Sequence, residues 1–193
     1  KVAESIEKSH KRGKISRKKR WEYKMNKIAQ FEKVSYEEFY KDWLKTFPNE
    51  TRDIAEIYNA IKLPRRATKG SAGYDFYTPI DLKIAPQETV LIPTGIRVKM
   101  ADDYVLMLFP RSGLGFKYRL QMNNTVGIID SDYYHADNEG HIFCKLTNDT
   151  NENKTVEIAS GQGMLQGIFV SFGITVDDEV DAVRTGGFGS TTK

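Results

Sequence analysis

The sequence predicts an all-β domain, a sandwich or barrel, that follows an N-terminal helical extension. From residue 65 onward, short apolar runs are separated by Gly, Pro, Asp and Asn, a pattern typical of short strands joined by turns. Residues 25–63 instead carry apolar side chains at helical spacing. The chain of 193 residues shows no dinucleotide-binding motif, no P-loop and no internal repeat.

The expected strands show two kinds of apolar pattern. Ile96, Val98 and Met100 alternate with charged residues, as in a strand with one buried face. Residues 90–92 and 105–109 are continuous apolar runs that end next to proline. Further short strands are expected at residues 142–146, 156–158, 168–170 and 174–176.

The extension is expected to form two helices. Ser35 and Glu38 have the spacing of a capping box, in which each side chain satisfies a free backbone amide at the helix start. Pro48 ends the first helix, and a second, shorter helix ends before Pro64. The aromatic face of the first helix fits either a partner-binding surface or packing on the body of the protein. We expect packing, because an exposed aromatic stripe is costly. The apolar positions are Tyr36, Phe39, Tyr40, Trp43, Leu44 and Phe47 in the first helix, and Ile54, Ile57, Tyr58 and Ile61 in the second.

Composition narrows the class of protein. Apolar residues make up 39% and charged residues 28% of the chain, which suits a globular protein with a hydrophobic core. No stretch approaches the roughly 20 apolar residues of a membrane helix, and no apolar run follows the basic start as in a signal peptide. Cys144 is the single cysteine, which excludes an internal disulfide and a cysteine metal cluster. We therefore expect a cytoplasmic protein without membrane contact.

The basic residues are concentrated at the N-terminus. Residues 1–24 contain 10 Lys or Arg and 3 Asp or Glu, whereas the remainder contains 19 and 23. This leader is expected to be a solvated, disordered tail, and a nucleic-acid-binding arm is the alternative. If the natural protein starts at Met25, the leader lies upstream of the functional unit. The sequence does not identify a nucleic-acid or protein partner for the N-terminal extension.

Two glycine-rich segments carry groups that suit a cation and a phosphate. Residues 70–75 combine small residues, which let a ligand approach the backbone, with the carboxylate of Asp75, which suits a hard cation. Residues 110–115 end an apolar strand with the guanidinium of Arg111, the hydroxyl of Ser112 and flexible backbone amides, which suit phosphate oxygens. A structural pair between Arg111 and a carboxylate is an equally good interpretation of the second segment.

Two further segments suit water activation and a flat ring. In residues 126–133, strand alternation would point Asp130 and Asp132 to one side and Tyr133 to the other. Paired carboxylates can hold a metal or orient water, although an ordinary Asp-rich turn is the alternative. Residues 184–192 are too polar and glycine-rich for a core, and Phe188 among glycines is placed to close over a flat ring. Together the four segments indicate a nucleotide phosphate site.

These segments, in this order, resemble the five motifs of the trimeric dUTPases. The matching residues are 72–75 (AGYD), 110–114 (PRSGL), 127–133 (GIIDSDY), 161–166 (GQGMLQ) and 186–191 (GGFGST). The likeness runs from about Leu63 to the C-terminus. It implies a dUTPase-like distorted jelly roll, or β-clip, over residues 64–181 and an active-site arm over residues 182–193. It also implies a homotrimer whose active sites each draw on more than one subunit.

The resemblance implies Mg²⁺-dependent hydrolysis of dUTP to dUMP and pyrophosphate by water attack at the α-phosphate. This reaction keeps uracil out of DNA and supplies dUMP for thymidylate synthesis. Asp130 would hold and activate the water, and Asp75 would support the magnesium shell through water. The chemistry agrees, because phosphoryl transfer needs positioning and charge neutralisation more than covalent help. The implied substrate-binding residues are Arg111, Ser112, Gly113 and Gln166 for the phosphates, Asn124, Gly127 and Ile128 for uracil, Tyr133 for the deoxyribose, Phe188 for stacking on uracil, and Arg184, Gly189, Ser190 and Thr191 in the arm that clamps the β- and γ-phosphates.

Three features depart from the family pattern. Arg184 stands one residue closer to the following glycine pair than is typical. The N-terminal helices occupy chain where the family usually starts with a strand. The turn after Tyr133 is longer, and its His135, Asp137 and Glu139 suggest a metal site but lack a ligand spacing, so a solvated loop is expected.

Two other functions stay open on the sequence. A dCTP deaminase shares the fold but needs a catalytic acid beside the pyrimidine, and residues 129–133 match the hydrolase better. A regulatory binding module would bind nucleotide and use the N-terminal helices or the leader to grip a protein or nucleic acid. That role is compatible with catalysis.

Overall fold

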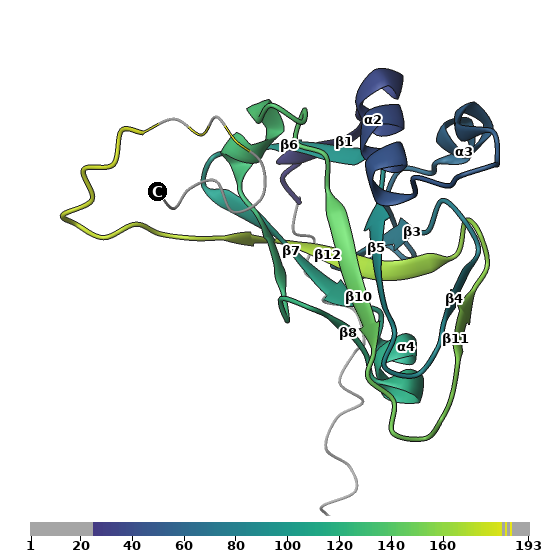
Figure 1. Ribbon diagram of the computed structural model, residues 1–193. Coiled ribbons are helices and arrows are strands. Elements are labelled where there is room, and N and C mark those ends of the chain that lie inside the picture. The colour runs from purple at the N-terminus through teal and green to yellow at the C-terminus, as the bar shows by residue number, and fades with distance from the viewer. Residues whose placement is uncertain (1–24, 183, 185, 187–193) are drawn as a thin grey trace, which may run out of the picture.

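The computed structural model describes residues 25–182, 184 and 186 (Figure 1). The basic leader and four predicted site residues, Phe188, Gly189, Ser190 and Thr191, lie outside the described residues. Strands dominate the described part, which confirms the predicted all-β class. In chain order the elements are β1 (Ala29–Lys33), α2 (Tyr36–Thr46), α3 (Ile54–Ala60), β2 (Arg65–Arg66), β3 (Tyr74–Tyr77), β4 (Leu82–Ile84), β5 (Thr89–Pro93), β6 (Ile96–Met100), β7 (Tyr104–Pro110), α4 (Ser112–Tyr118), β8 (Leu120–Met122), β9 (Gly127–Ile129), the 3-10 turn η1 (Ser131–His135), β10 (Phe143–Asn148), β11 (Val156–Ile158) and β12 (Gly163–Ser171).

Within these residues the strands pair into small antiparallel sheets. A five-stranded sheet has the order β2-β3-β12-β7-β9, and a three-stranded sheet has the order β5-β10-β8. Two further pairs are β1-β6 and β11-β4. The long strand β12 lies between β3 and β7 and places Gln166 opposite both Asp75 and Phe109. Strand β12 therefore brings together segments that are far apart in the sequence.

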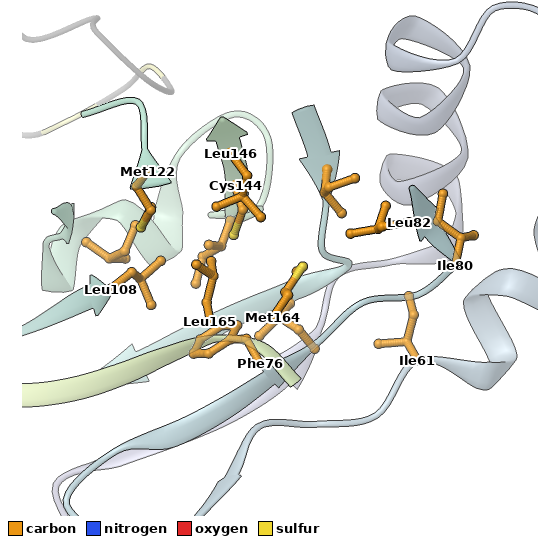
Figure 2. Packing of buried hydrophobic residues seen from close by; sticks show 14 of the residues in the cluster. Ile61, Phe76, Ile80, Leu82, Leu108, Met122, Cys144, Leu146, Met164 and Leu165 are labelled. Atoms are coloured by element: carbon orange, nitrogen blue, oxygen red, sulfur yellow. The ribbon is translucent and has the colours of Figure 1, made fainter. Parts of the chain in front are cut away.

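The hydrophobic core lies between these sheets. Figure 2 shows side chains from β3, β7, β10 and β12 meeting there, among them Phe76, Leu108, Leu146 and Leu165. The alternation predicted for β10 is present, because Leu146 is buried while its neighbour Lys145 is exposed. Each fully buried apolar side chain of this size contributes roughly 1.5–3 kcal/mol to folding.

One expected strand is absent from the described residues. Strand β12 ends at Ser171, and residues 174–176 are not paired. The side chains of Ile174 and Val176 are exposed in the extended segment that projects from the body in Figure 1. An apolar run forms a strand only where a neighbouring strand accepts its backbone hydrogen bonds, and this segment has no such neighbour within the described chain.

The prediction of helix for residues 25–63 is right for α2 and α3 but wrong for Ala29–Lys33. These five residues form β1, which pairs antiparallel with β6. Phe31 of β1 packs on the rings of Tyr74, Phe76 and Phe169. The free edge of β6 and this aromatic cluster override the helical pattern, since strand preference depends strongly on packing. Each helix among the described residues is too short or too polar to cross a lipid bilayer.

Helix α2 begins with only half of the predicted capping box. The Ser35 hydroxyl accepts a hydrogen bond from the backbone amide of Glu38 at 3.1 Å, as expected. The Glu38 side chain does not return the bond but contacts Lys41. Glu139 takes its place, because its carboxylate accepts from the Ser35 amide at 2.8 Å and from the Ser35 hydroxyl at 2.6 Å. The helix start is therefore tied to the turn after η1.

The aromatic face of α2 packs on the body in part, as predicted. Phe39 and Trp43 are fully buried, whereas Tyr36 and Tyr40 are exposed. The packing requires a glycine at position 95, where the backbone is left-handed (φ +71°) and a Cβ atom would lie 2.3 Å from Cδ1 of Ile61 and 3.2 Å from the Phe39 ring. The two N-terminal helices therefore form a covering layer whose contact with the β domain depends on close backbone approach.

Candidate active site

The Asp75 and Arg111 side chains meet at one end of the central sheet. Strand β12 pairs with β3 and β7, and this pairing brings the ends of those strands together. The distance from Nε of Arg111 to Oδ1 of Asp75 is 3.2 Å, and the guanidinium also donates to the Gly163 carbonyl at 3.3 Å. The structural Arg–carboxylate pair considered above is therefore present. The Arg111 side chain remains 44% exposed, so it can still reach a ligand.

Ser112 and Gly113 begin α4 directly after Arg111. Together with Arg111 they line a cavity of about 470 Å³, whose other walls include Tyr77 and Gly163. No atom lies within 4 Å of a Cβ built on Gly113, so the backbone there is open. An exposed guanidinium, a hydroxyl and open backbone amides suit phosphate oxygens.

Gln166 connects the two strands that carry this cluster. Its amide group donates to the Pro110 carbonyl at 3.2 Å. Its Oε1 atom would lie 2.9 Å from a Cβ on Gly73, which explains the glycine in that segment. In this structure Gln166 therefore binds the backbone of the phosphate-binding segment, rather than lining the 470 Å³ cavity.

Asn124 and Gly127 line a second cavity, of about 590 Å³, at the turn that joins β8 to β9. A Cβ on Gly127 would lie 3.1 Å from side-chain atoms of Leu108 and Met122, so a larger residue there would crowd these side chains. The side chain of Ile128 is 50% exposed and is not part of this cavity. Of the three residues predicted to contact uracil, Asn124 and Gly127 therefore line the same cavity, and Ile128 does not.

The carboxylates of Asp130 and Asp132 both contact the guanidinium of Arg184. The chain turns into η1 after β9, so the strand alternation assumed above does not apply. Both carboxylates nevertheless contact Arg184, Asp130 at 2.6 Å and Asp132 at 2.9 Å. Both side chains remain about half exposed. Arg184 of the C-terminal arm therefore contacts Asp130, the predicted catalytic residue, within the same chain.

Tyr133 is held inside the turn that follows Asp130. Its side chain is 4% exposed, and the Arg184 guanidinium lies 5.7 Å from the centre of its ring. The phenol hydroxyl donates to the His141 carbonyl at 2.7 Å and accepts from the Asn138 amide at 2.8 Å. Burial raises the pKa of Tyr133 to about 12. The ring is therefore neutral and fixed at neutral pH.

The turn at residues 134–139 is only in part the solvated loop expected from the sequence. His135 and Asp137 are exposed, but Ala136 is buried, Asn138 binds Tyr133, and Glu139 binds Ser35. Within the described residues, no group of three or more His, Cys, Asp or Glu side chains is arranged to hold a metal ion. The polar residues of this turn thus connect the N-terminal helices to the Asp130 segment.

The phosphate-binding and carboxylate segments lie far apart in one chain. In Figure 1, α4 lies at the lower end of the molecule, whereas the turn that follows β9 lies at the upper end. Arg111 flanks α4, and Asp130 flanks the turn. The two segments therefore lie at opposite ends of the described chain.

Comparison with known proteins identifies one family. The dUTPase family model matches residues 59–192. A deoxyuridine 5'-triphosphate nucleotidohydrolase of Lactococcus lactis is 42% identical over 142 residues, covering 72% of this chain and 93% of that protein. The corresponding protein of Actinobacillus pleuropneumoniae serotype 3 is 41% identical over 145 residues, covering 71% and 91%.

Solved structures agree with the sequence matches. A dUTPase crystal structure from Streptococcus mutans has a TM-score of 0.56 and 34% identity, and the match covers 75% of this chain and 97% of that one. A mutant dUTPase from phage phi11 of S. aureus, described with a coordinated structural Mg(II) ion, shares the fold at 19% identity and a TM-score of 0.56.

Proposed function

The chain belongs to the dUTPase family, and we propose that it hydrolyses dUTP to dUMP and pyrophosphate in active sites shared between copies of the chain. The observation that carries the proposal is the family match over residues 59–192, which contains every segment singled out in the sequence. The relatives at 41% and 42% identity carry the name of this activity.

The reaction begins with water attack at the α-phosphate, and Asp130 is the group that orients the water. Its carboxylate is half exposed at the end of β9, the strand that begins at Gly127. A carboxylate that accepts the proton of the attacking water in this way contributes roughly 10²–10⁴ to the rate. Arg111, Ser112 and Gly113, in the phosphate-binding segment, bind the phosphate oxygens of the substrate. They hold the triphosphate in line with the attacking water.

The residues present fit a magnesium ion that is bound chiefly by the substrate. Mg²⁺ keeps several waters and usually takes one or two carboxylates together with phosphate oxygens. The described residues supply no three-ligand cluster, but Asp75 offers a carboxylate beside the phosphate-binding Arg111. Asp75 would therefore hold the ion through water. The ion itself neutralises charge on the triphosphate.

Two features support an assembly of copies with shared sites, which the family resemblance makes a homotrimer. Arg111 flanks α4 and Asp130 flanks the turn after β9, and these elements lie at opposite ends of the subunit, so a second copy would complete a site that uses both residues. The segment after β12 also carries large exposed apolar side chains. Soluble proteins rarely leave such a row uncovered, so a neighbouring copy would bury it. The exposed residues are Phe172, Ile174, Val176 and Val180.

The sugar and base contacts complete the proposal. Buried Tyr133 would lie under the deoxyribose and exclude a 2′-hydroxyl, while Asn124 and the backbone around Gly127 and Ile128 would read uracil. The arm would add Phe188 on the base, with Arg184, Gly189, Ser190 and Thr191 on the phosphates. Arg184 would then exchange its contact with Asp130 for a phosphate contact, which frees the carboxylate for water.

Incubation of the purified protein with each dNTP and with UTP, with and without Mg²⁺, tests the function. Pyrophosphate release from dUTP alone, dependent on Mg²⁺, is the expected result. Ammonia release from dCTP would instead indicate the deaminase alternative, and no turnover of any nucleotide would contradict the proposal.

A further inference from the structure

Helix α2 reaches the β domain through a buried side-chain hydrogen bond. Oδ2 of Asp42 lies 2.7 Å from Nδ1 of His141. Asp42 is 7% exposed and His141 is fully buried. The two residues are 99 positions apart in the chain. A polar contact this deep is retained only when its geometry satisfies both groups, because an unpaired buried polar group is costly.

The imidazole ring of His141 is fixed from both sides. The Gly95 amide donates to Nε2 of His141 at 2.8 Å. Because Nε2 accepts this bond, the ring proton is assigned to Nδ1, which donates to Asp42. Removing the Asp42 carboxylate leaves a buried N–H without an acceptor and releases one of the two constraints on the ring.

His141 in turn fixes the tyrosine of the proposed sugar site. Its backbone carbonyl accepts from the Tyr133 hydroxyl at 2.7 Å. Asn138 donates to the same hydroxyl at 2.8 Å and reaches the same carbonyl at 3.4 Å. A shift of residue 141 therefore moves the acceptor that sets the position of the Tyr133 ring.

The same helix forms a wall of the cavity at the turn between β8 and β9. That cavity, of about 590 Å³, is lined by Asn124 in this turn, by Gly127 at the start of β9, and by Lys41 and Asp42 on α2. Asn138 lines it as well. Asp42 thus lies between the proposed nucleoside cavity and the residue that anchors Tyr133.

We propose that Asp42 and His141 are positioning residues for nucleoside recognition, so that the N-terminal extension helps to discriminate dUTP from UTP. The inference rests on the proposed function. Exclusion of a 2′-hydroxyl depends on where the Tyr133 ring stands, and displacement of a contact group by about 1 Å can cost 10²-fold in rate. An anchor that was merely structural would change stability and leave the discrimination unchanged.

Asp42→Ala tests the proposal through the kinetics of both nucleotides. We expect the KM for dUTP to rise, kcat to change less, and the ratio of kcat/KM for dUTP over UTP to fall at least about tenfold. Asp42→Asn keeps an oxygen acceptor for the His141 N–H and should retain most of the wild-type ratio. Trp43→Phe is the matched control, because Trp43 lies next to Asp42 in α2 and the change removes its indole hydrogen bond to Glu50. This variant should lower the melting temperature and leave the dUTP/UTP ratio unchanged.

A second variant keeps the test decisive if Asp42→Ala folds poorly. Tyr133→Phe removes the hydroxyl that binds His141 without altering α2 and should relax discrimination in the same direction. In the double variant the two effects should not add, because both act on one network. A folded Asp42→Ala protein with wild-type discrimination, or unchanged discrimination in Tyr133→Phe, would overturn the proposal. Absence of dUTP turnover in the wild-type protein would instead count against the proposed function.

Discussion

Asp130 and Arg184 meet through a 2.6 Å contact between a carboxylate oxygen and a guanidinium nitrogen. Arg111 and Asp75 form a similar pair at 3.2 Å. Each proposed phosphate-binding arginine is therefore paired with a carboxylate proposed for water or magnesium. On the proposed mechanism the triphosphate replaces the carboxylate as the partner of each arginine. The Arg111–Asp75 pair is partly exposed, and surface pairs are worth only about 0–1 kcal/mol, so the exchange there costs little.

Asp130→Asn should reduce kcat for dUTP by roughly 10²–10⁴-fold, because the amide cannot accept the proton of the attacking water. Binding of dUTP, measured by calorimetry, should persist. Asp132→Asn is the matched control, since Asp132 also contacts Arg184 but is not assigned the water. Similar losses in the two variants, or near-normal turnover by Asp130→Asn, would remove the special role of Asp130.

Sequence patterns located the residues with obvious chemistry better than those that support them. Asn124 and Gly127 do share a cavity, and Asp130 does stand at a strand end beside an arginine. Asp42 and His141 gave no comparable signal, because the contact spans 99 positions and each residue alone resembles a surface group. In the turn at residues 134–139, His135 and Asp137 are exposed as expected, but Asn138 and Glu139 are not free in solvent. The sequence does not show their partners, because Glu139 binds Ser35 on a distant element.

At the scale of elements, the N-terminal extension shows what local patterns can predict. The apolar spacing and Ser35 cap predicted α2, and Phe39 and Trp43 are buried as expected. Strand β1 was missed because five residues carry little periodic signal, and their structure is decided by pairing with β6. The opposite happened after β12, where a strand was expected at residues 174–176 and none forms. The apolar run is present, but no strand of the described chain lies beside it to pair with.

Gly95→Ala should loosen the contact of the N-terminal helices with the β domain. A left-handed alanine is strained, and its Cβ would crowd Ile61 and Phe39. Together these effects should lower the free energy of unfolding by about 2–4 kcal/mol. Gly70→Ala is the control, because a Cβ there meets nothing within 4 Å. Equal melting temperatures for the two variants in thermal denaturation would show that close approach at Gly95 is unimportant.

Glu50 should make the helical layer sensitive to acid. Hydrogen bonds from Arg52 lower the pKa of Glu50 from 4.5 to about 2. Trp43 also donates to this carboxylate at 3.0 Å. A lowered pKa adds stability that is present above pH 4.5 and is lost as the pH falls toward 2. In denaturant titrations at several pH values, the stability advantage of wild type over Glu50→Gln should shrink across this window. An advantage that is constant with pH would contradict the assignment.

At the scale of the whole molecule, one copy carries two separated parts of a site. Arg111 flanks α4 at one end of the subunit, and Asp130 flanks η1 at the other (Figure 1). The apolar side chains after β12 project from the body without cover in the described chain. Closed assembly of identical copies would satisfy both features at once, because each copy would supply one part of a site to a neighbour and bury its projecting segment.

Subunit complementation tests this account most directly. Arg111→Ala and Asp130→Asn are each made alone and then co-expressed with different affinity tags, so that mixed assemblies can be isolated by two-step purification. Each variant alone should be nearly inactive on dUTP. If the two residues come from different copies, each mixed trimer isolated in this way has both intact residues in one of its three sites, so activity should recover to about a third of wild type. Mixed assemblies no more active than the separate variants would contradict a dUTP site built between copies of the chain.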